Sequence, residues 1–306
     1  MKVFLCETIH EAAYQKLKER AEIINDWDRI GEADALINRA LQIGPKEMEK
    51  MHSMKVIAVH GTGTDGVNLE EAKTRNIKVV YAPHLNANAV AELNVGLALA
   101  ACRKIVQARD VIDAGREKEA KALLCGSELQ GKTAGLIGLG AIGRRTARIL
   151  RHGFGMDVQA YTPNLTKERA EKNDCRLAES LDGLLESSDF VFLSLPLTAD
   201  TYHLMNQERF AKMKESAFLI NTSRGDLIDE GALLKSLKEG ALKGAASDVL
   251  CEEFPGKDNP FLRLENFVVT PHIGANTDEA LYTVGVTCVQ EIFDVMDGKE
   301  PEYLVV

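Results

Sequence analysis

The sequence GLIGLGAIGRRTARIL (135–150) joins an apolar segment to a helical pattern through Gly138, Gly140 and Gly143. These residues have the spacing Gly-x-Gly-x-x-Gly. In a strand–turn–helix the first glycine permits a tight turn, the second lets the backbone approach a pyrophosphate, and the third lets helix and strand pack closely. An ordinary tight turn is the alternative. The strand before it, the helix after it and the further strand–helix units favour a dinucleotide-binding turn, with phosphates at the helix N-terminus.

Short apolar runs alternate with amphipathic segments along most of the chain. We expect strands at 2–6, 22–25, 34–38, 55–60, 78–82, 133–140, 156–162, 189–196, 217–223, 244–250 and 266–272. Helical spacing predicts helices at 10–21, 44–53, 87–115 and 278–298. This alternation indicates an α/β protein with two doubly wound, mostly parallel sheets, each covered by helices on both faces.

Composition excludes several classes of function. The 306 residues carry a net charge of −9, which argues against a nucleic-acid partner. No apolar run approaches the roughly 20 residues that cross a bilayer, and Glu7 interrupts the N-terminal apolar segment too early for a signal peptide. The six cysteines have neither Cys-x-x-Cys nor metal-ligand spacing, so we expect reduced thiols, a cytoplasmic location and no metal.

The second strand after the glycine turn predicts how the adenosine ribose is recognised. An acidic residue is expected at its end, but the sequence there is QAYTPNLTKER, with Thr162 at that position. A hydroxyl supported by Asn164, Lys167 and Arg169 would accept a 2′-phosphate that a carboxylate would repel. Either NAD or NADP therefore remains possible as the cofactor. The basic residues are alternatively an ordinary solvated first turn of a helix.

Three further segments follow predicted strands, at the edge where ligands gather in open α/β sheets. They are LINTSRGDLID (219–229), ASDVLCEEFPG (246–256) and TPHIGAN (270–276). Together they supply one arginine, a cluster of carboxylates and one histidine. A guanidinium binds a carboxylate in a fork, and an imidazole exchanges a proton near neutral pH. These residue types predict acid–base chemistry on a small acid.

On these motifs the chain resembles the D-isomer-specific 2-hydroxyacid dehydrogenases. The resemblance covers nearly the whole chain. It rests on HGTGTDGVN (60–68), NANAVAE (86–92), GLIGLGAIGR (135–144), LPLTADTYHLM (195–205), NTSRGDLIDE (221–230), DVLCEEFP (248–255) and TPHIGANTDEA (270–280). It implies an NAD(P)-dependent oxidoreductase that interconverts a D-2-hydroxyacid and its 2-oxoacid. It also implies a Rossmann dinucleotide-binding domain (99–282) inserted into a flavodoxin-like substrate domain (1–98 and 283–306).

The resemblance assigns three catalytic residues. Arg224 would bind the substrate carboxylate and carbonyl, His272 would be the acid/base, and Glu253 would tune the imidazole. Phe254 stands where the family usually has proline after the acid, so Glu252 competes for that role. Cys251, between Asp248 and the acid, is either a reactive thiol or a packing residue.

The resemblance also implies binding residues. The cofactor set is Gly138, Gly140, Ala141, Ile142, Thr162, Pro196, Thr201, Thr222, Ser223, Arg224, Asp248, His272 and Gly274. The substrate set is Thr62, Gly63, Asn86, Arg224 and His272. Arg39 would reach a distal phosphate or carboxylate, or else lie on the surface.

Family members are usually dimers through the long crossing helix, which predicts a homodimer here. A second reading of the same fold is a corepressor-like or scaffolding protein that binds the dinucleotide without significant turnover. The retained Arg224, Glu253 and His272 favour the enzyme.

Overall fold

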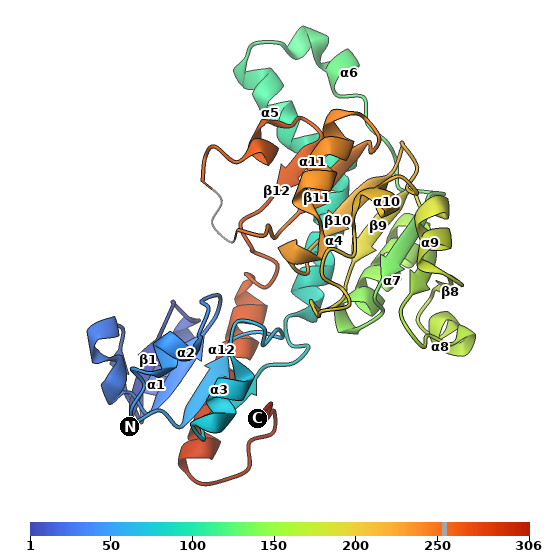
Figure 1. The fold of residues 1–306 in the computed structure, drawn as a ribbon. Coiled ribbons are helices and arrows are strands. Elements are labelled where there is room, and N and C mark those ends of the chain that lie inside the picture. Colours follow the sequence, from blue (N-terminus) through green and yellow to red (C-terminus); the bar gives the residue numbers. More distant parts are fainter. Residues whose placement is uncertain (253–255) are drawn as a thin grey trace. The chain divides into compact units, whose positions relative to one another are not determined.

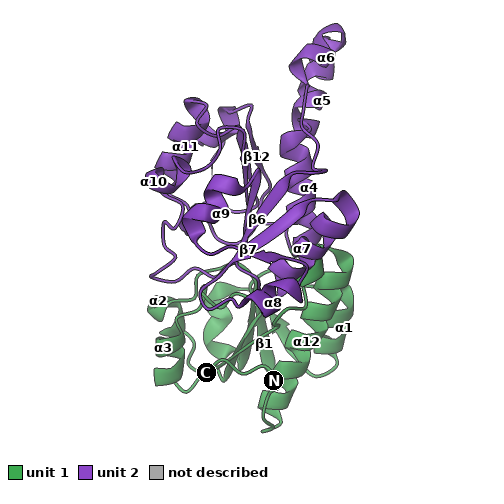
Figure 2. Cartoon of the chain, turned by 90° about the vertical axis from the view of Figure 1, so that its right-hand side faces the viewer, with its two compact units in different colours: residues 1–89, 275–306 green, residues 90–274 purple. Residues whose placement is uncertain are grey.

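The structure is a computed structural model and describes residues 1–252 and 256–306 (Figure 1). The chain divides into two compact units, each built on its own sheet (Figure 2). Unit 1 comprises Met1–Ala89 and Ala275–Val306, and unit 2 comprises Val90–Gly274. Unit 2 is thus inserted into unit 1 in the sequence. Residues 90–98 and 275–282 fall in the opposite units from the domains expected above, whose functional boundaries stay a prediction.

Unit 1 contains a five-stranded sheet in the order β2-β1-β3-β4-β5, with all strands parallel. Its strands are β1 (Lys2–Leu5), β2 (Glu22–Ile24), β3 (Ala35–Asn38), β4 (Val56–Val59) and β5 (Lys78–Tyr81). Its helices are α1 (Glu11–Lys18), α2 (Pro45–Met48), α3 (Leu69–Thr74) and α12 (Asp278–Met296), with a 3-10 turn at Trp27–Glu32. This strand order is the flavodoxin-like one.

Unit 2 contains a seven-stranded parallel sheet in the order β12-β11-β10-β9-β6-β7-β8. Its strands are β6 (Thr133–Ile137), β7 (Asp157–Tyr161), β8 (Arg176–Leu177), β9 (Phe190–Leu193), β10 (Phe218–Asn221), β11 (Gly244–Ser247) and β12 (Phe267–Val269). Counted from β6 this is the Rossmann order 3-2-1-4-5-6 with one strand added. Strand β8 is absent from the sequence prediction.

Helices cover both faces of the unit 2 sheet. They are α4 (Ala87–Cys102), which begins in unit 1, α7 (Ala141–Phe154), α8 (Lys167–Glu171), α9 (Leu181–Ser187), α10 (Gln207–Phe210) and α11 (Glu230–Lys238). Two further helices of unit 2, α5 (Ile105–Asp113) and α6 (Ala120–Leu123), extend away from the sheet (Figure 2). Short 3-10 turns lie at Glu117–Glu119, Gly225–Leu227 and Pro260–Arg263.

Alternate residues of each strand enter separate cores, which explains the continuous apolar runs in the sequence. In unit 1, Val3 packs with α1 and α12 on one face, whereas Phe4 packs with α2 and α3 on the other. In unit 2, Leu136 joins α4 and α7, whereas Ile137 joins α9, α10 and α11. Both sheets are therefore doubly wound, as predicted.

The prediction of a single long helix at 87–115 is wrong, because the structure has two helices there. The helix ends at Cys102 because the Cys102 carbonyl accepts the Ser127 N–H at 2.9 Å from a returning segment. Lys104 then takes a left-handed conformation with φ of +53°, and its ammonium donates to the Leu123 carbonyl at 2.8 Å. A new helix, α5, starts at Ile105.

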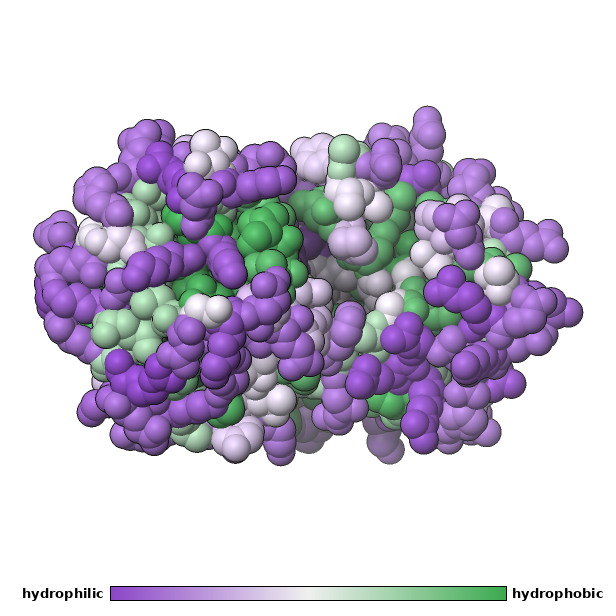
Figure 3. Space-filling view, turned by 90° about the horizontal axis from the view of Figure 1, so that it is seen from below, coloured by the Kyte–Doolittle hydropathy of each residue, from purple (hydrophilic) through white to green (hydrophobic). Residues whose placement is uncertain are grey.

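The part of the surface that Figure 3 draws is mostly hydrophilic, and hydrophobic residues show in smaller areas between the hydrophilic ones. No helix within the described part of the chain has the length and apolar character of a membrane span.

Candidate functional site

The carboxyl ends of six strands of unit 2 lie on one row of the sheet. The paired residues that form this row are, in spatial order, Val269, Ser247, Asn221, Leu193, Ile137 and Tyr161. Each predicted site segment leaves the sheet one residue later. The residues that follow the row are Thr270, Asp248, Thr222, Ser194, Gly138 and Thr162. The sheet thus brings the histidine, acid, arginine, glycine and Thr162 segments to a single edge.

The glycine turn after β6 is fixed by backbone packing. Gly138 has a φ of +99°, and a Cβ there would lie 2.1 Å from the Ser194 carbonyl oxygen. A Cβ on Gly143 would lie 2.4 Å from the Gly138 oxygen. The fold itself therefore requires the first and third glycines, because the backbone after β9 approaches Gly138 closely and α7 packs tightly against the turn.

Gly140 is different, because no described atom would lie within 4 Å of a Cβ there. Its φ of −75° and ψ of −161° suit any residue, and no side chain in the described chain caps α7 at this position. The N–H groups of the first turn, at Ala141 and Ile142, have no partner within the helix. Nearby, the buried Ser194 hydroxyl oxygen has no hydrogen-bond partner among the described residues. A dinucleotide pyrophosphate fits this place. It would find open space at Gly140, N–H donors at the N-terminus of α7, and the Ser194 hydroxyl nearby.

At the end of β7 the ribose position carries Thr162 and not an acid. The next turn contains Asn164 in a left-handed conformation with φ of +62°. Lys167 and Arg169 are exposed at the start of α8, and the Lys167 ammonium lies 3.9 Å from Glu171. Helix α8 also carries Glu168 and Glu171, so its charges balance, but the strand end itself has Thr162 in place of a carboxylate.

Asn221 shapes the arginine loop. Its side-chain amide donates to the Arg224 carbonyl at 2.8 Å and accepts the Ser223 N–H at 2.9 Å. A Cβ on Gly225 would lie 2.2 Å from the Leu250 carbonyl carbon, so only glycine allows this loop to contact the segment after β11. The Arg224 guanidinium donates to the Ser223 carbonyl at 2.7 Å.

Asp248 holds the histidine segment. The Asp248 side chain is buried, with 1% of the residue exposed, and its oxygens accept the Ile273 N–H at 2.9 Å and the Gly274 N–H at 2.7 Å. They also accept the Thr270 hydroxyl at 2.5 Å, and the Asp248 carbonyl accepts the His272 N–H at 2.8 Å. His272 lies in the middle of this loop with a φ of +53°. Such a conformation is uncommon outside glycine and marks a position that its surroundings determine.

The acid assigned from the sequence, Glu253, lies outside the described residues. Cys251, two residues earlier, is described, and its N–H donates to the Glu230 carboxylate at 2.8 Å. Burial, together with the negative charges of Glu230 and Asp226, raises the pKa of the Cys251 thiol. The interpretation of Cys251 as a reactive thiolate is therefore disfavoured.

Several predicted cofactor residues already form hydrogen bonds within the protein. The Thr201 hydroxyl donates to the Pro196 carbonyl at 2.8 Å, which closes the loop after β9. The Ser223 hydroxyl donates to the Leu193 carbonyl at 2.9 Å, and the Thr222 hydroxyl donates to Asn94 at 2.9 Å. Their oxygens keep acceptor capacity, but their protons are used internally.

In unit 1 the predicted substrate loop follows β4. The Thr62 hydroxyl donates to the Asn86 side-chain oxygen at 2.9 Å, and the Ala82 N–H donates to the Gly61 carbonyl at 3.0 Å. The glycine-rich segment that includes Gly63 is therefore tied to the connection after β5. The Arg39 guanidinium, after β3, donates to the Thr8 carbonyl at 2.9 Å.

His60 begins the same loop and is 8% exposed. Burial, and to a lesser extent the positive charge of Arg39, lower the pKa of His60 to about 4. A Cβ on Gly285 of α12 would lie 3.4 Å from the His60 Nε2 atom and 2.8 Å from the Ala13 Cβ. A neutral imidazole is thus packed beside a helix position that must stay small.

Sequence reasoning missed the buried polar residues beneath the site. Asn94, Thr146 and Asn221 are each 0% exposed, yet each carries hydrogen-bonding side-chain atoms. The available signal was weak: Asn94 is a polar residue inside the apolar segment NVGLALAAC, and Thr146 interrupts the apolar face of α7.

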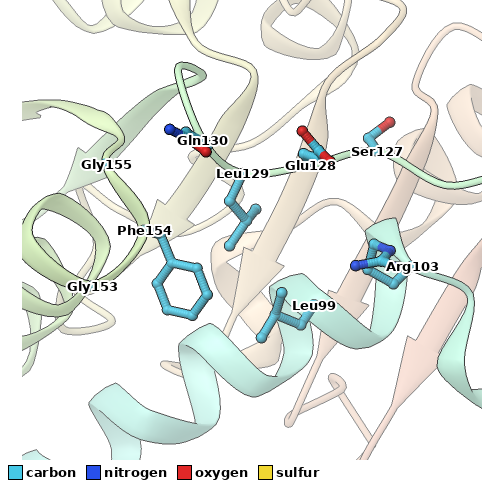
Figure 4. A pocket seen from close by; sticks show the side chains of 9 residues that line it. All are labelled: Leu99, Arg103, Ser127, Glu128, Leu129, Gln130, Gly153, Phe154 and Gly155. Carbon is cyan, nitrogen blue, oxygen red and sulfur yellow. The ribbon is translucent and has the colours of Figure 1, made fainter.

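A separate pocket lies at the other ends of β6 and α7 (Figure 4). It has a volume of about 380 Å³ and an apolar floor of Leu99, Leu129 and Phe154, with Arg103 and Glu128 at its rim. The predicted site residues that the structure describes do not line it. Across residues 1–252 and 256–306, no three His, Cys, Asp or Glu side chains are grouped as a metal site.

Comparison with known proteins matches residues 95–274 to the D-isomer specific 2-hydroxyacid dehydrogenase, NAD binding domain. The chain is 38% identical over 314 residues to D-3-phosphoglycerate dehydrogenase of Methanocaldococcus jannaschii, covering 100% of this chain and 59% of that protein. It is 37% identical to glyoxylate reductase of Thermofilum pendens, covering 99% of this chain and 94% of that protein.

Two solved structures are similar over almost their full length. A protein of Thermus thermophilus has a TM-score of 0.90 at 34% identity, covering 100% of both chains. D-lactate dehydrogenase from Aquifex aeolicus, complexed with NAD and lactic acid, has a TM-score of 0.85 at 25% identity, covering 97% of this chain and 96% of that chain. The sheet orders, the glycine turn and these similarities agree. This chain belongs to the D-isomer specific 2-hydroxyacid dehydrogenase family of NAD-binding oxidoreductases.

Proposed function

We propose that the protein is an NAD(P)-dependent dehydrogenase that interconverts a D-2-hydroxyacid and its 2-oxoacid. The observation that carries this proposal is the common row of strand ends in unit 2. Along that single edge the order is histidine segment, Asp248, arginine loop, glycine turn and Thr162. A dinucleotide lying along this edge would have its phosphates at the turn, its adenosine near Thr162 and its reactive ring on the side of Arg224 and His272.

Gly138, Gly140, Ala141 and Ile142 would hold the cofactor through the turn and the helix N-terminus. When bound, the nicotinamide supplies the chemistry of hydride transfer. The remaining chemistry belongs to side chains. Arg224 presents a planar fork that binds the substrate carboxylate and polarises the 2-oxo oxygen, which a lysine ammonium would not do in the same way.

His272 exchanges the proton of the substrate hydroxyl. As the alcohol is oxidised the imidazole takes this proton, and in reduction the imidazolium returns it to the developing alkoxide. In the proposal Glu253 accepts a hydrogen bond from the other ring nitrogen, which fixes the tautomer and favours the charged ring. Backbone N–H groups at Thr62 and Gly63 serve as further carboxylate ligands, with Asn86 ordering the loop.

We further propose that NADP is accepted as well as NAD. Thr162 carries no charge to repel a 2′-phosphate, and the exposed Lys167 and Arg169 lie on the helix that follows. Support for an NAD(P)-type cofactor comes from the family match and from the NAD complex of the Aquifex aeolicus relative.

A homodimer is also proposed. Helix α5 exposes three large apolar side chains: Ile105 is 57% exposed, Val106 51% and Ile112 56%. Such a group on one short helix is typical of a protein interface. Light scattering on a size-exclusion column should give twice the 33.6 kDa chain mass, and Val106→Asp should reduce it to one chain.

The test of function is the loss of NADH or NADPH absorbance with a panel of 2-oxoacids, including glyoxylate, hydroxypyruvate and pyruvate. His272→Ala should remove most turnover and leave cofactor binding, followed by NAD(P)H fluorescence, unchanged. Arg224→Lys should raise KM for the 2-oxoacid and lower kcat. If the protein binds NAD(P)H but oxidises it with no member of the panel, the dehydrogenase proposal fails and the corepressor-like reading replaces it.

A further inference from the structure

Asn94 joins three separate elements of unit 2. It lies on α4 and is 0% exposed. Its side-chain oxygen accepts the Thr222 hydroxyl at 2.9 Å, and its amide nitrogen donates to the Thr146 hydroxyl oxygen at 3.2 Å. Thr146 is itself 0% exposed and lies on α7, whereas Thr222 directly follows β10. One buried amide therefore connects α4, α7 and the arginine loop.

Each side of this junction leads to a different part of the site. Thr146 is on the second turn of α7, whose first turn begins at Ala141 beside the glycine turn. Thr222 belongs to the loop that Asn221 closes through its bonds to Ser223 and Arg224. A path through helix α7, the two bonds of Asn94 and the two bonds of Asn221 thus runs from the glycine turn to Arg224.

The chemistry of the junction makes it stiff. An amide presents an acceptor and a donor on one rigid plane, so it can hold both hydroxyls only if α7 and the arginine loop keep their spacing. In a buried site, where water cannot replace a lost partner, a shift of either element leaves a polar group unsatisfied. A movement of α7 relative to the loop would therefore stretch one of these two bonds.

We propose that Asn94 is a positioning residue that couples occupation of the glycine turn by a pyrophosphate to the placement of the Arg224 loop. This inference rests on the proposed function of the turn as the cofactor site. Because coupling is reciprocal, a bound cofactor would tighten the binding of a 2-oxoacid at Arg224, and the acid would tighten the cofactor.

The experiment uses ADP, which carries the pyrophosphate but lacks the nicotinamide that would contact the loop directly. Hydrogen exchange of the peptide covering 221–227 is measured in the full chain with and without saturating ADP. In the wild type, ADP should slow this exchange about fivefold. In Asn94→Leu the slowing should fall below about twofold, while ADP affinity and protection of residues 138–145 persist.

Thr146→Val and Thr146→Ser form a second pair that tests the junction even if Asn94→Leu does not fold, because Thr146 is bonded to Asn94 and is not among the predicted binding residues. Valine removes the hydroxyl and should abolish the effect, whereas serine keeps it and should preserve the effect. Ser236→Ala deletes a buried hydroxyl that donates to the Ala232 carbonyl at 2.8 Å within α11; it is the control and should behave as wild type.

Two outcomes separate the inference from the proposed function. If ADP does not bind the wild type, the cofactor assignment falls and the coupling falls with it. If ADP binds but leaves the loop unprotected, or still protects it in Asn94→Leu and Thr146→Val, only the coupling is overturned. If ADP protects the loop in Thr146→Ser but not in Thr146→Val, the coupling is supported.

Discussion

His60 gives the protein a defined loss of stability in mild acid. Its ring is buried beside Gly285, and its pKa lies at about 4 because of burial and the nearby Arg39 charge. An exposed histidine of the unfolded chain has a pKa of about 6.5. The unfolded state therefore takes up a proton first as the pH falls, and the folded state resists it.

The sign and size of the effect follow from this difference. A depressed histidine pKa contributes stability that is fully present above pH 6.5 and is lost as the pH falls toward 4. At about 1.4 kcal/mol for each pKa unit, the loss across this window amounts to about 3 kcal/mol. In His60→Asn the free energy of unfolding should no longer show this fall between pH 6.5 and 4, whatever stability the variant loses at neutral pH.

The assay is urea unfolding followed by tryptophan fluorescence at a series of pH values from 7.5 to 4. The chain has one tryptophan, Trp27, which lies in unit 1 and packs against Phe4, so it reports the unit that contains His60. His52→Asn, at an exposed histidine of the same unit, serves as the control. Equal pH slopes for the wild type and His60→Asn would refute the burial argument.

Four further substitutions test the site. Gly140→Ala should leave the unfolding midpoint unchanged, because no described atom is within 4 Å, yet weaken NADH binding on the order of tenfold in a fluorescence titration. Asp248→Asn should cost about 3 kcal/mol in urea unfolding and lower kcat with little change in NADH affinity, because the amide cannot accept both loop N–H groups. A cofactor-affinity loss with normal kcat would contradict that role. Gly225→Ala should cost ~3 kcal/mol or more and raise KM for the 2-oxoacid, whereas the open position Gly153→Ala should not. Thr162→Asp should reduce kcat/KM for NADPH at least about tenfold more than for NADH, and an unchanged ratio would exclude Thr162 from the ribose site.

Most strands could be predicted from the sequence because both faces of each sheet are buried, which makes nearly every strand residue apolar. Strand β8 could not, since it has only two residues, Arg176 and Leu177, at the sheet edge and Arg176 is exposed. The break after Cys102 was unpredictable for another reason. The segment that ends α4 returns from 126–127, and no local glycine or proline announces it.

The site residues at strand ends were accessible to sequence reasoning because parallel strands in register deliver their next residues to one edge. Thr222, Asp248 and Thr270 each follow the same row of pairs, so neighbouring motifs in the sequence become neighbours in space. The residues beneath that edge were not accessible. Asn94 bonds to Thr222, which lies 128 positions away in the chain, and its role exists only once the fold has formed.

Asp248 shows how the two kinds of information combine. The motif predicted it as a cofactor residue, whereas its bonds make it the anchor of the loop that carries His272. A non-glycine residue at a φ of +53° costs on the order of 1 kcal/mol or more. A buried carboxylate that accepts two N–H groups and a hydroxyl supplies enough to offset that cost, since bonds to a charged acceptor contribute about 1.5–3 kcal/mol each. An asparagine has only one acceptor atom, so it would leave one N–H facing another donor. The need for an acid at this position therefore follows from the geometry of the histidine loop alone, whether or not the carboxylate also contacts a ligand.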